Sequence, residues 1–414
     1  MSVSIVELIA RAEIEVDRLG HAPSTGSQYR WAWSQFELFC SREGIASFTE
    51  DVATSFLEAV AADHREGRIK EWKRRLLRKA VLVLSEVAAT GSYRWGVSRR
   101  THPNDGLDAT FRPVQEEFEA WLRTRGLAPA TEELYAVVSR RVLAGFAERG
   151  VTGARALSGA DVSAAITFLA RWYRPGSMRT VVTAVRVLCR FLEDSGYCPG
   201  LSGTVPGVVV RRVRSVGVIP RESVDALTGS PDLSTPAGRR DRAILLLAAR
   251  TGLRPVDIVH LKLCDIDWRA ARITITQHKT GVGLTLPLLA DVGDAIADYL
   301  IRDRPAGAAD ERVFLRSQAP FTGLSPSSGL YHVAERAFAV TATPVPDGSG
   351  RGLRVLRASL ATRMLEAGTP LPVISGVLGH RGTESAKHYL AGDEQRMREC
   401  CLDFAGIEPA GGRS

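Results

Sequence analysis

Hydrophobic residues recur at helical spacing through the first part of the chain. The clearest stripe consists of aromatic residues at steps of three and four positions: Tyr29, Trp33, Phe36 and Phe39. Such a stripe is typical of the buried face of a helix. Gly44 ends this predicted helix, and the segment Ser47-Phe48-Thr49-Glu50 is typical of a capping box that opens the next one. The pattern therefore predicts a helical module.

A basic segment follows between Arg65 and Val87. Its predicted apolar stripe includes Trp72, Leu76 and Val83. Its cations, almost without acids, are Arg65, Arg68, Lys70, Lys73, Arg74, Arg75, Arg78 and Lys79. A basic helix of this kind is often only a solvated surface, but this density of cations favours contact with DNA phosphates. We select Lys73, Arg74 and Arg78 as candidate DNA-binding residues.

The same design returns in the next hundred residues. The pair Thr25 and Tyr29 is matched by Thr131 and Tyr135, and later helix signals follow in the same order. We therefore predict two related modules of four or five helices, joined by the polar, turn-rich stretch 98–113.

Arginines mark the end of the second module. Arg179, Arg186 and Arg190 fall on one face of a predicted helix, opposite its apolar residues. The stretch 199–215 is rich in glycine, valine and arginine and is predicted to be an interdomain linker. We expect these three arginines, together with Arg211 and Arg212 in the linker, to contact DNA.

The pattern becomes mixed after residue 219. The run 241–250 predicts a buried helix that stops at Gly252, and Pro255 suits the first turn of another helix, with Arg254 at its mouth. Residues 272–276 and 284–288 alternate with period two, which predicts a β-hairpin with Lys279 near its tip.

Composition narrows the class of protein. With 414 residues, 45% of them hydrophobic and 24% charged, the chain fits an ordinary globular protein of about two to three domains. A net charge of +8 is compatible with a nucleic-acid partner without requiring one. The chain has no long apolar run, which predicts no membrane span and a cytoplasmic location.

Cysteine usage predicts neither disulfides nor metal. The six cysteines include no C-x-x-C pair: Cys40, Cys189, Cys198, Cys264, Cys400 and Cys401. We interpret them as buried, reduced thiols, and we expect no metal and no cofactor.

The most specific pattern lies between Leu353 and Tyr389. Arg357 begins R-A-S-L-A-T, a Leu-Gly-His ends at His380, and Tyr389 follows in H-Y-L. In order and spacing these motifs resemble those of the tyrosine recombinases, or phage-type integrases. The resemblance extends over about 220–405 and more loosely over 110–198.

The resemblance implies a role for each matched residue. Arg254 and Arg357 would bind the scissile phosphate, Lys279 would protonate the leaving oxygen, His380 would hydrogen-bond the phosphate, and Tyr389 would be the nucleophile. Asp257 matches an acidic residue that orients the site. Arg354 stands where the family prefers histidine; it can donate to a phosphate but is a poor proton acceptor.

The residue types suit phosphoryl transfer without a metal. Arginine keeps its charge and contacts two phosphate oxygens at once, and a phosphotyrosine ester conserves the energy of the broken bond. The resemblance implies a site-specific DNA recombinase with a 3′-phosphotyrosyl intermediate. It also implies double-stranded DNA as the partner and a homo-tetramer on two DNA sites, or assembly with sister recombinases.

The expected fold is mainly α: duplicated helical modules of the SAM-like, core-binding type, plus a mixed α+β catalytic domain with a small antiparallel sheet. The expected domains are an accessory module at 1–97, a core-binding domain at 110–200, a catalytic domain at 216–408 and a tail at 409–414. Three alternatives remain open: a type IB topoisomerase, a catalytically weakened DNA-binding partner, and a plain helical scaffold.

Overall fold

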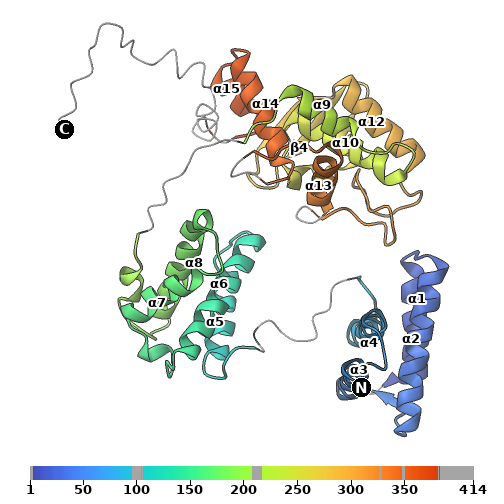
Figure 1. Cartoon of the computed structure of the whole chain (residues 1–414), viewed down its shortest axis with the longest axis vertical. Coiled ribbons are helices and arrows are strands. Elements are labelled where there is room, and N and C mark those ends of the chain that lie inside the picture. The colour runs from blue at the N-terminus through green and yellow to red at the C-terminus, as the bar shows by residue number, and fades with distance from the viewer. Residues whose placement is uncertain are drawn as a thin grey trace, which may run out of the picture. The chain divides into compact units, whose positions relative to one another are not determined.

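The computed structural model describes residues 3–95, 104, 106–207, 217–325, 329–346, 350–380 and 382. Residues 97–213 form one compact unit, and residues 1–96 and 214–414 are grouped in the other. Figure 1 labels their elements. The second unit contains separate hydrophobic cores, one built from residues between 5 and 93 and another from residues between 219 and 356. The N-terminal and C-terminal parts therefore each have a core of their own.

Four helices and a two-stranded ribbon build the N-terminal part. They are β1 (Val3–Ser4), α1 (Ile5–Arg18), α2 (Pro23–Arg42), β2 (Ser47–Phe48), α3 (Glu50–Arg65) and α4 (Glu71–Thr90). The predicted aromatic stripe is on α2, where Tyr29, Trp33 and Phe36 are buried. The Trp33 indole also donates to the carbonyl of Ala80 on α4 at 3.0 Å, so α2 and α4 are joined by a buried hydrogen bond as well as by packing.

Two local predictions in this part are wrong. Thr49 caps α3 by accepting from the Val52 amide, while Ser47 pairs with Ser4 in the β1–β2 ribbon. The capping box beginning at Ser47 therefore does not form. Trp72 is 60% exposed and leaves the predicted apolar stripe, because the buried face of α4 runs instead through Leu77, Ala80, Val81, Val83, Leu84 and Val87.

The middle unit repeats the four-helix order. Its elements are α5 (Arg112–Arg123), α6 (Pro129–Glu148), η1 (Ala154–Ala156), α7 (Gly159–Leu169), α8 (Pro175–Asp194) and η2 (Leu201–Thr204). Its second and fourth helices have 20 residues each, as have α2 and α4. In each module the second helix packs on both the first and the fourth. The predicted duplication is confirmed, with four helices in each copy.

The C-terminal part is a mixed α+β structure. Its elements are α9 (Arg221–Gly229), α10 (Pro236–Thr251), α11 (Pro255–His260), η3 (Leu263–Asp265), β3 (Ile266–Asp267), β4 (Arg272–Thr276), β5 (Gly283–Pro287), α12 (Ala290–Arg302), α13 (Gly329–Thr341), α14 (Arg354–Glu366) and α15 (Leu371–Leu378). Helix α10 packs against α9, α12 and α14 and contains the predicted buried run. The predicted fold class is confirmed.

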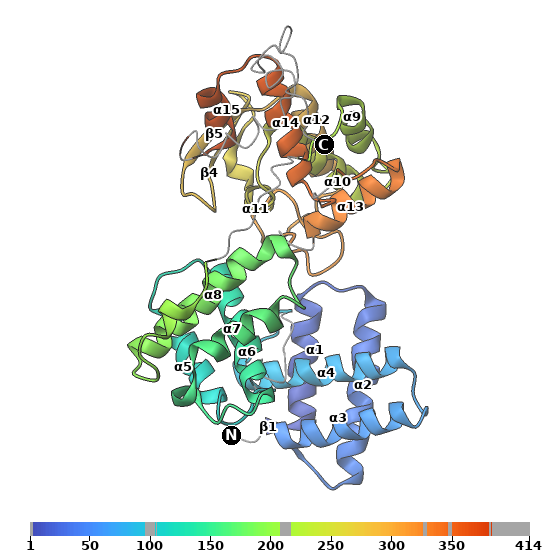
Figure 2. The ribbon, with the colours of Figure 1, turned by 60° about the vertical axis from the view of Figure 1, so that its left-hand side comes forward.

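The predicted hairpin is also confirmed. Strands β3, β4 and β5 form an antiparallel sheet in that order, with Ile273 opposite Leu286 and Ile275 opposite Leu284. These four apolar side chains are buried, and the residues between them are exposed, as period-two alternation requires. Helix α15 lies beside β5 (Figure 2), so the end of α15 is close to the hairpin.

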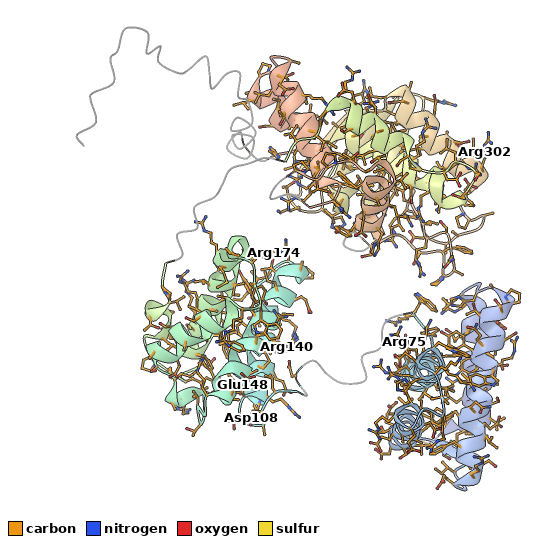
Figure 3. All side chains as sticks on the ribbon, in the orientation of Figure 1. Arg75, Asp108, Arg140, Glu148, Arg174 and Arg302 are labelled. Atoms are coloured by element: carbon orange, nitrogen blue, oxygen red, sulfur yellow. The ribbon has the colours of Figure 1, made fainter. Side chains whose placement is uncertain are left out.

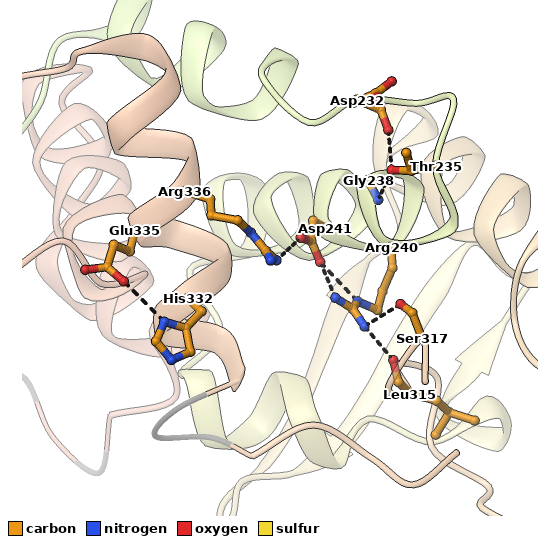
Figure 4. Close-up of polar contacts among 10 residues, drawn as sticks. All are labelled: Asp232, Thr235, Gly238, Arg240, Asp241, Leu315, Ser317, His332, Glu335 and Arg336. Carbon is orange, nitrogen blue, oxygen red and sulfur yellow. Dashed lines mark hydrogen bonds and ion pairs between the residues drawn. The ribbon is translucent and has the colours of Figure 1, made fainter. Parts of the chain in front are cut away.

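A buried ionic cluster attaches α13 and a loop to α10 (Figure 4). Asp241 accepts from the neighbouring Arg240 at 2.8 Å and from Arg336 of α13 at 2.5 Å. Arg240 also donates to the carbonyl of Leu315 and the hydroxyl of Ser317. Because every charge in this cluster has an opposite charge or a carbonyl as partner, the burial of Asp241 is compensated.

Three of the described cysteines are buried, as predicted: Cys40, Cys189 and Cys198. Cys264 is exposed, so the prediction of a buried thiol is wrong there, because it lies in the short η3 turn rather than on a core-facing helix. Cys400 and Cys401 lie outside the described residues. Among the described helices, none is both long and apolar enough to cross a membrane.

Candidate active site

Arg254 stands at the mouth of α11, as predicted. It is the N-cap residue, with extended backbone, and Pro255 begins the helix. Just before it, Gly252 ends α10 with φ of +65°. A Cβ on Gly252 would lie 2.8 Å from Cδ2 of Leu378, so glycine here allows the end of α10 to approach the end of α15 closely.

Arg357 joins these two helix ends to α14. Its side chain is buried, with Nη1 donating to the Gly252 carbonyl at 2.6 Å and Nη2 donating to the Leu378 carbonyl at 2.9 Å. Both acceptors are backbone oxygens at helix ends, where intrahelical partners are lacking. The guanidinium is therefore held in place by the ends of two helices, α10 and α15, that are distant from each other in sequence.

His380 reaches Arg357 through a helix cap. Gly379 adopts φ of +61° after α15, and the amide of His380 donates back to the carbonyl of Ser375 at 2.9 Å. This turn places Nε2 of His380 2.9 Å from Nη2 of Arg357. Because a guanidinium only donates, Nε2 accepts in this contact, and the neutral ring carries its proton on Nδ1. The Leu-Gly-His motif is thus both a helix cap and part of the site.

Lys279 is exposed in the loop between β4 and β5. The loop is closed by hydrogen bonds from the Gln277 amide to the Val282 carbonyl and from the Gly281 amide to the Gln277 carbonyl. On the protein side of the loop, the buried carboxylate of Asp257 accepts a hydrogen bond from the backbone amide of His278 at 2.8 Å. Asp257 therefore anchors the base of the loop that carries Lys279.

Gln277 was missed from sequence. Its side chain is buried, with Oε1 accepting from Nη1 of Arg254 at 2.7 Å and from the Thr280 hydroxyl at 2.7 Å. Its Nε2 donates to the Leu378 carbonyl at 3.2 Å. The sequence pattern could have predicted its burial, because Gln277 continues the inward-facing alternation of Ile273 and Ile275. A polar side chain at such a position requires a buried hydrogen-bond partner.

Arg354 is the first residue of α14 and is exposed, one turn before Arg357. Within the described ranges, its guanidinium has no hydrogen bond or ion pair. A cation at a helix N-terminus opposes the helix dipole, so Arg354 does not stabilise α14. Its charge is instead available to an anionic ligand. Tyr389, by contrast, lies outside the described residues.

The candidate DNA-binding arginines of α8 differ in their surroundings. Arg179 and Arg190 are exposed, whereas Arg186 donates to the carbonyls of Val205 and Pro206 at 3.3 and 3.2 Å. Arg186 therefore also holds the segment that follows η2. Figure 3 labels a further cation, Arg174, at the start of the same helix. Arg211 and Arg212 lie outside the described residues.

The cations of α4 are partly engaged within their own module. Arg74 and Arg75 (the latter labelled in Figure 3) both hydrogen-bond Glu71, which lowers the pKa of that carboxyl to about 2. Lys73 places its ammonium 4.9 Å from the ring centre of Trp31, while Arg78 is exposed. Arg78 is thus the least engaged of the three candidates.

Together, the structure connects Arg254, Gln277, Arg357 and His380 by hydrogen bonds, and holds Lys279 on the adjacent loop. Two permanent cations and a ring nitrogen belong to one hydrogen-bonded network, an arrangement suited to binding and polarising a phosphodiester. No set of three or more histidine, cysteine or acidic side chains in the described part of the chain is placed to hold a metal ion.

Comparison with known proteins finds relatives of one family. The phage integrase family model matches residues 218–396. A putative integrase/recombinase from Sinorhizobium fredii, y4rF, is 30% identical over 70% of this chain and 68% of its own length. Another from that bacterium, y4rA, is 39% identical over 55% of each chain, so this chain spans about half of that relative's length.

Two solved structures show the same fold at 17% identity. The XerH site-specific recombinase bound to a palindromic difH substrate gives a TM-score of 0.55, over 71% of this chain and 83% of that one. A lambda integrase tetramer bound to a Holliday junction gives 0.53, over 82% and 90%. With a relative at this identity and coverage, the chain belongs to the phage integrase family.

Proposed function

We propose that this protein is a site-specific DNA recombinase that cuts and rejoins duplex DNA through a 3′-phosphotyrosyl intermediate. The observation that carries the proposal is the convergence of Arg254, Arg357 and His380 from the mouth of α11, from α14 and from the end of α15. Nothing in the packing of a plain helical scaffold requires two arginines and a histidine to be joined in this way.

The reaction begins when the Tyr389 hydroxyl gives its proton to solvent and its oxygen attacks the scissile phosphorus. The bond to the 5′ oxygen breaks, and Lys279 supplies a proton to that leaving oxygen. Arg254 and Arg357 hold the non-bridging oxygens as their negative charge develops. The 3′ phosphate is now esterified to the tyrosine, and a 5′ hydroxyl is free.

Rejoining reverses these steps with a different strand. A 5′ hydroxyl from the partner DNA gives its proton to Lys279, which cleavage left neutral, and attacks the phosphotyrosine. The tyrosine oxygen leaves and takes up a proton from solvent. The number of phosphoester bonds is unchanged, so no nucleotide cofactor is consumed. Arg354 contributes as a further donor to the phosphate and not as a base, because its guanidinium stays protonated.

DNA is held by more than the catalytic part. We assign residues 1–97 to an accessory DNA-binding module, 110–200 to the core-binding domain and 216–408 to the catalytic domain, with 409–414 as a tail. Support comes from the separate hydrophobic cores and from the basic helices α4 and α8. Candidate phosphate contacts are Lys73, Arg74, Arg78, Arg179, Arg186, Arg190, Arg211 and Arg212.

The assembly we propose is four protomers on two DNA sites, in a mobile element that is integrated, excised or transposed. A lambda integrase tetramer bound to a Holliday junction supports that arrangement by fold alone. Sister recombinases are an alternative source of the other protomers. A DNA substrate of this kind places the protein in the cytoplasm at the nucleoid.

The test is covalent trapping on a nicked suicide duplex. Duplexes are first selected from a random library by binding to the wild-type protein, and the selected site is then nicked so that the cleaved end diffuses away. We expect a protein–DNA adduct that resists denaturant. Selective binding without any adduct would identify a catalytically weakened partner, whereas relaxation of plasmids that lack the site would identify a type IB topoisomerase.

A further inference from the structure

We propose that Gln277 is a positioning residue that aims Arg254 at the scissile phosphate and couples it to Arg357 through the Leu378 carbonyl. The inference rests on the proposed strand-transfer function and adds to it a residue that the family motifs do not single out. Gln277 would not touch DNA; it would act through the two arginines.

The hydrogen bonds of the Gln277 amide leave little freedom. Its Oε1 accepts from Arg254 and from Thr280, each at 2.7 Å, and its Nε2 donates to Leu378 at 3.2 Å. The amide orientation follows from chemistry, since a guanidinium only donates and a carbonyl only accepts. With the side chain 1% exposed, water does not offer substitute partners.

The Leu378 carbonyl is the link between the arginines. It accepts from Nε2 of Gln277 and also from Nη2 of Arg357, at 2.9 Å, using both of its lone pairs. A continuous hydrogen-bonded path therefore runs from Arg254 through Gln277 and Leu378 to Arg357, and on to His380. Loss of its central amide would free Arg254 to rotate while Arg357 kept its bond to Gly252.

A neutral acceptor is the suitable partner for Arg254. A carboxylate at position 277 would attract the guanidinium more strongly, but it would neutralise the charge that the phosphate needs. One of its oxygens would also face the Leu378 carbonyl oxygen, so that two acceptors would meet without a donor between them. The nearby carboxylate, Asp257, bonds the His278 amide instead. Glutamine thus steers the arginine and leaves its charge available.

Gly379 gives independent support. A Cβ at this position would lie 2.2 Å from Nε2 of Gln277, closer than any real contact. The glycine of the Leu-Gly-His motif is therefore required by the positive φ and also by the space that the Gln277 amide occupies. The turn at Gly379, which positions His380, therefore packs directly against the side chain of Gln277.

The experiment compares full-length variants on the suicide duplex. Gln277→Met keeps the length of the side chain and removes its polar atoms, and Gln277→Glu keeps the shape and adds charge. The matched control is Thr274→Val, which removes a hydroxyl that pairs with Thr285 on the exposed face of the same hairpin. Equilibrium DNA binding and the single-turnover rate of adduct formation are measured separately, and thermal melting verifies folding.

We expect both Gln277 variants to form adduct about 10- to 100-fold more slowly, as is common when a group that positions a transition-state donor is lost. DNA affinity should change by no more than about twofold, because most phosphate contacts lie elsewhere. Thr274→Val should stay within about threefold of wild type. A Gln277→Met protein that cleaves at the wild-type rate would overturn the inference, and so would one that loses rate and DNA affinity in equal proportion.

A second duplex identifies the group through which Gln277 acts. In it, a methylphosphonate replaces the scissile phosphate and removes the negative charge that arginine neutralises. The rate defects of Arg254→Ala and Gln277→Met should shrink together on this duplex, while that of Lys279→Ala should persist. A Gln277→Met defect that persisted would refute action through Arg254. Wild-type protein without adduct on either duplex would instead refute the proposed function, and this inference with it.

Discussion

Arg357 is the residue on which the site depends most. It is a buried cation whose donors hold two helix ends and the His380 ring. We predict that Arg357→Lys will slow adduct formation by about 10²- to 10³-fold, because an ammonium cannot reproduce the fork that contacts two oxygens. Denaturant unfolding should also show a loss of about 1–3 kcal/mol, because the Gly252 carbonyl loses this donor while the Leu378 carbonyl keeps its bond from Gln277. A variant with normal cleavage would contradict the assigned role.

Arg354 offers a pH test. Wild-type protein should show no titration of the cleavage rate from this position, since arginine stays charged. In Arg354→His, we expect the rate to rise as the pH increases through about 6.5, because a histidine there accepts a proton only when neutral. The readout is the difference between the two pH–rate profiles, which cancels any titration of His380. Identical profiles would show that position 354 does not reach the reacting groups.

The cysteines allow a test of burial. Burial raises the pKa of Cys189 to about 12 and that of Cys40 to about 11, so few thiolates exist at pH 8, whereas Cys264 is exposed. We predict that iodoacetamide will label Cys264 in the folded protein well before Cys40 or Cys189, as followed by peptide mass spectrometry. Cys264→Ser is the control, and early labelling of Cys189 in that variant would show the middle unit to be looser than described.

At the scale of elements, strong periodicity was predictive. The stripe on α2, the alternating hairpin strands and the Gly252 stop were all foreseen, because each is set by local steric rules and a single buried face. Failures occurred where tertiary contacts decide. Trp72 follows the helical period of α4 and is still exposed, and the β1–β2 ribbon joins residues too distant in sequence for any local pattern.

The candidate site divides in the same way. Motif spacing identified Arg254, Lys279, Arg357 and His380, because each belongs to a recognisable sequence pattern. Gln277 has no such pattern: its role arises only when the end of α15 is placed against the hairpin. The sequence likewise could not predict that Arg186 is engaged within the protein, because its carbonyl partners belong to the segment after η2.

Gly379 and Gly44 form a matched pair at the ends of α15 and α2. Both have positive φ, but a Cβ on Gly44 meets nothing within 4 Å, whereas one on Gly379 meets Gln277. Alanine at either position should cost about 1–2 kcal/mol of backbone strain in thermal unfolding, and Gly379→Ala should cost more because its Cβ also collides with Gln277. Only Gly379→Ala should also slow adduct formation, because it displaces the amide that holds Arg254. Equal cleavage by both variants would argue against that coupling.

At the scale of the whole molecule, the cations of helix α8 predict how DNA affinity depends on salt concentration. Each exposed cation that contacts a phosphate should add about 1 to the slope of log affinity against log salt. Arg179→Ala and Arg190→Ala should each lower that slope, whereas Arg186→Ala should lower it less and reduce stability, because Arg186 binds two carbonyls. Fluorescence anisotropy at a series of salt concentrations measures the slopes. Equal slopes for all three variants and wild type would remove α8 from the DNA interface.

The central claim is that Tyr389 becomes joined to the 3′ phosphate of cut DNA. The most direct measurement is to trap the adduct on a labelled suicide duplex, digest it with trypsin and nuclease, and locate the modified peptide by mass spectrometry. We predict a nucleotide on Tyr389, a free 5′ hydroxyl on the released strand, and no adduct from Tyr389→Phe. A nucleotide on another residue, or an adduct that survives Tyr389→Phe, would contradict the account.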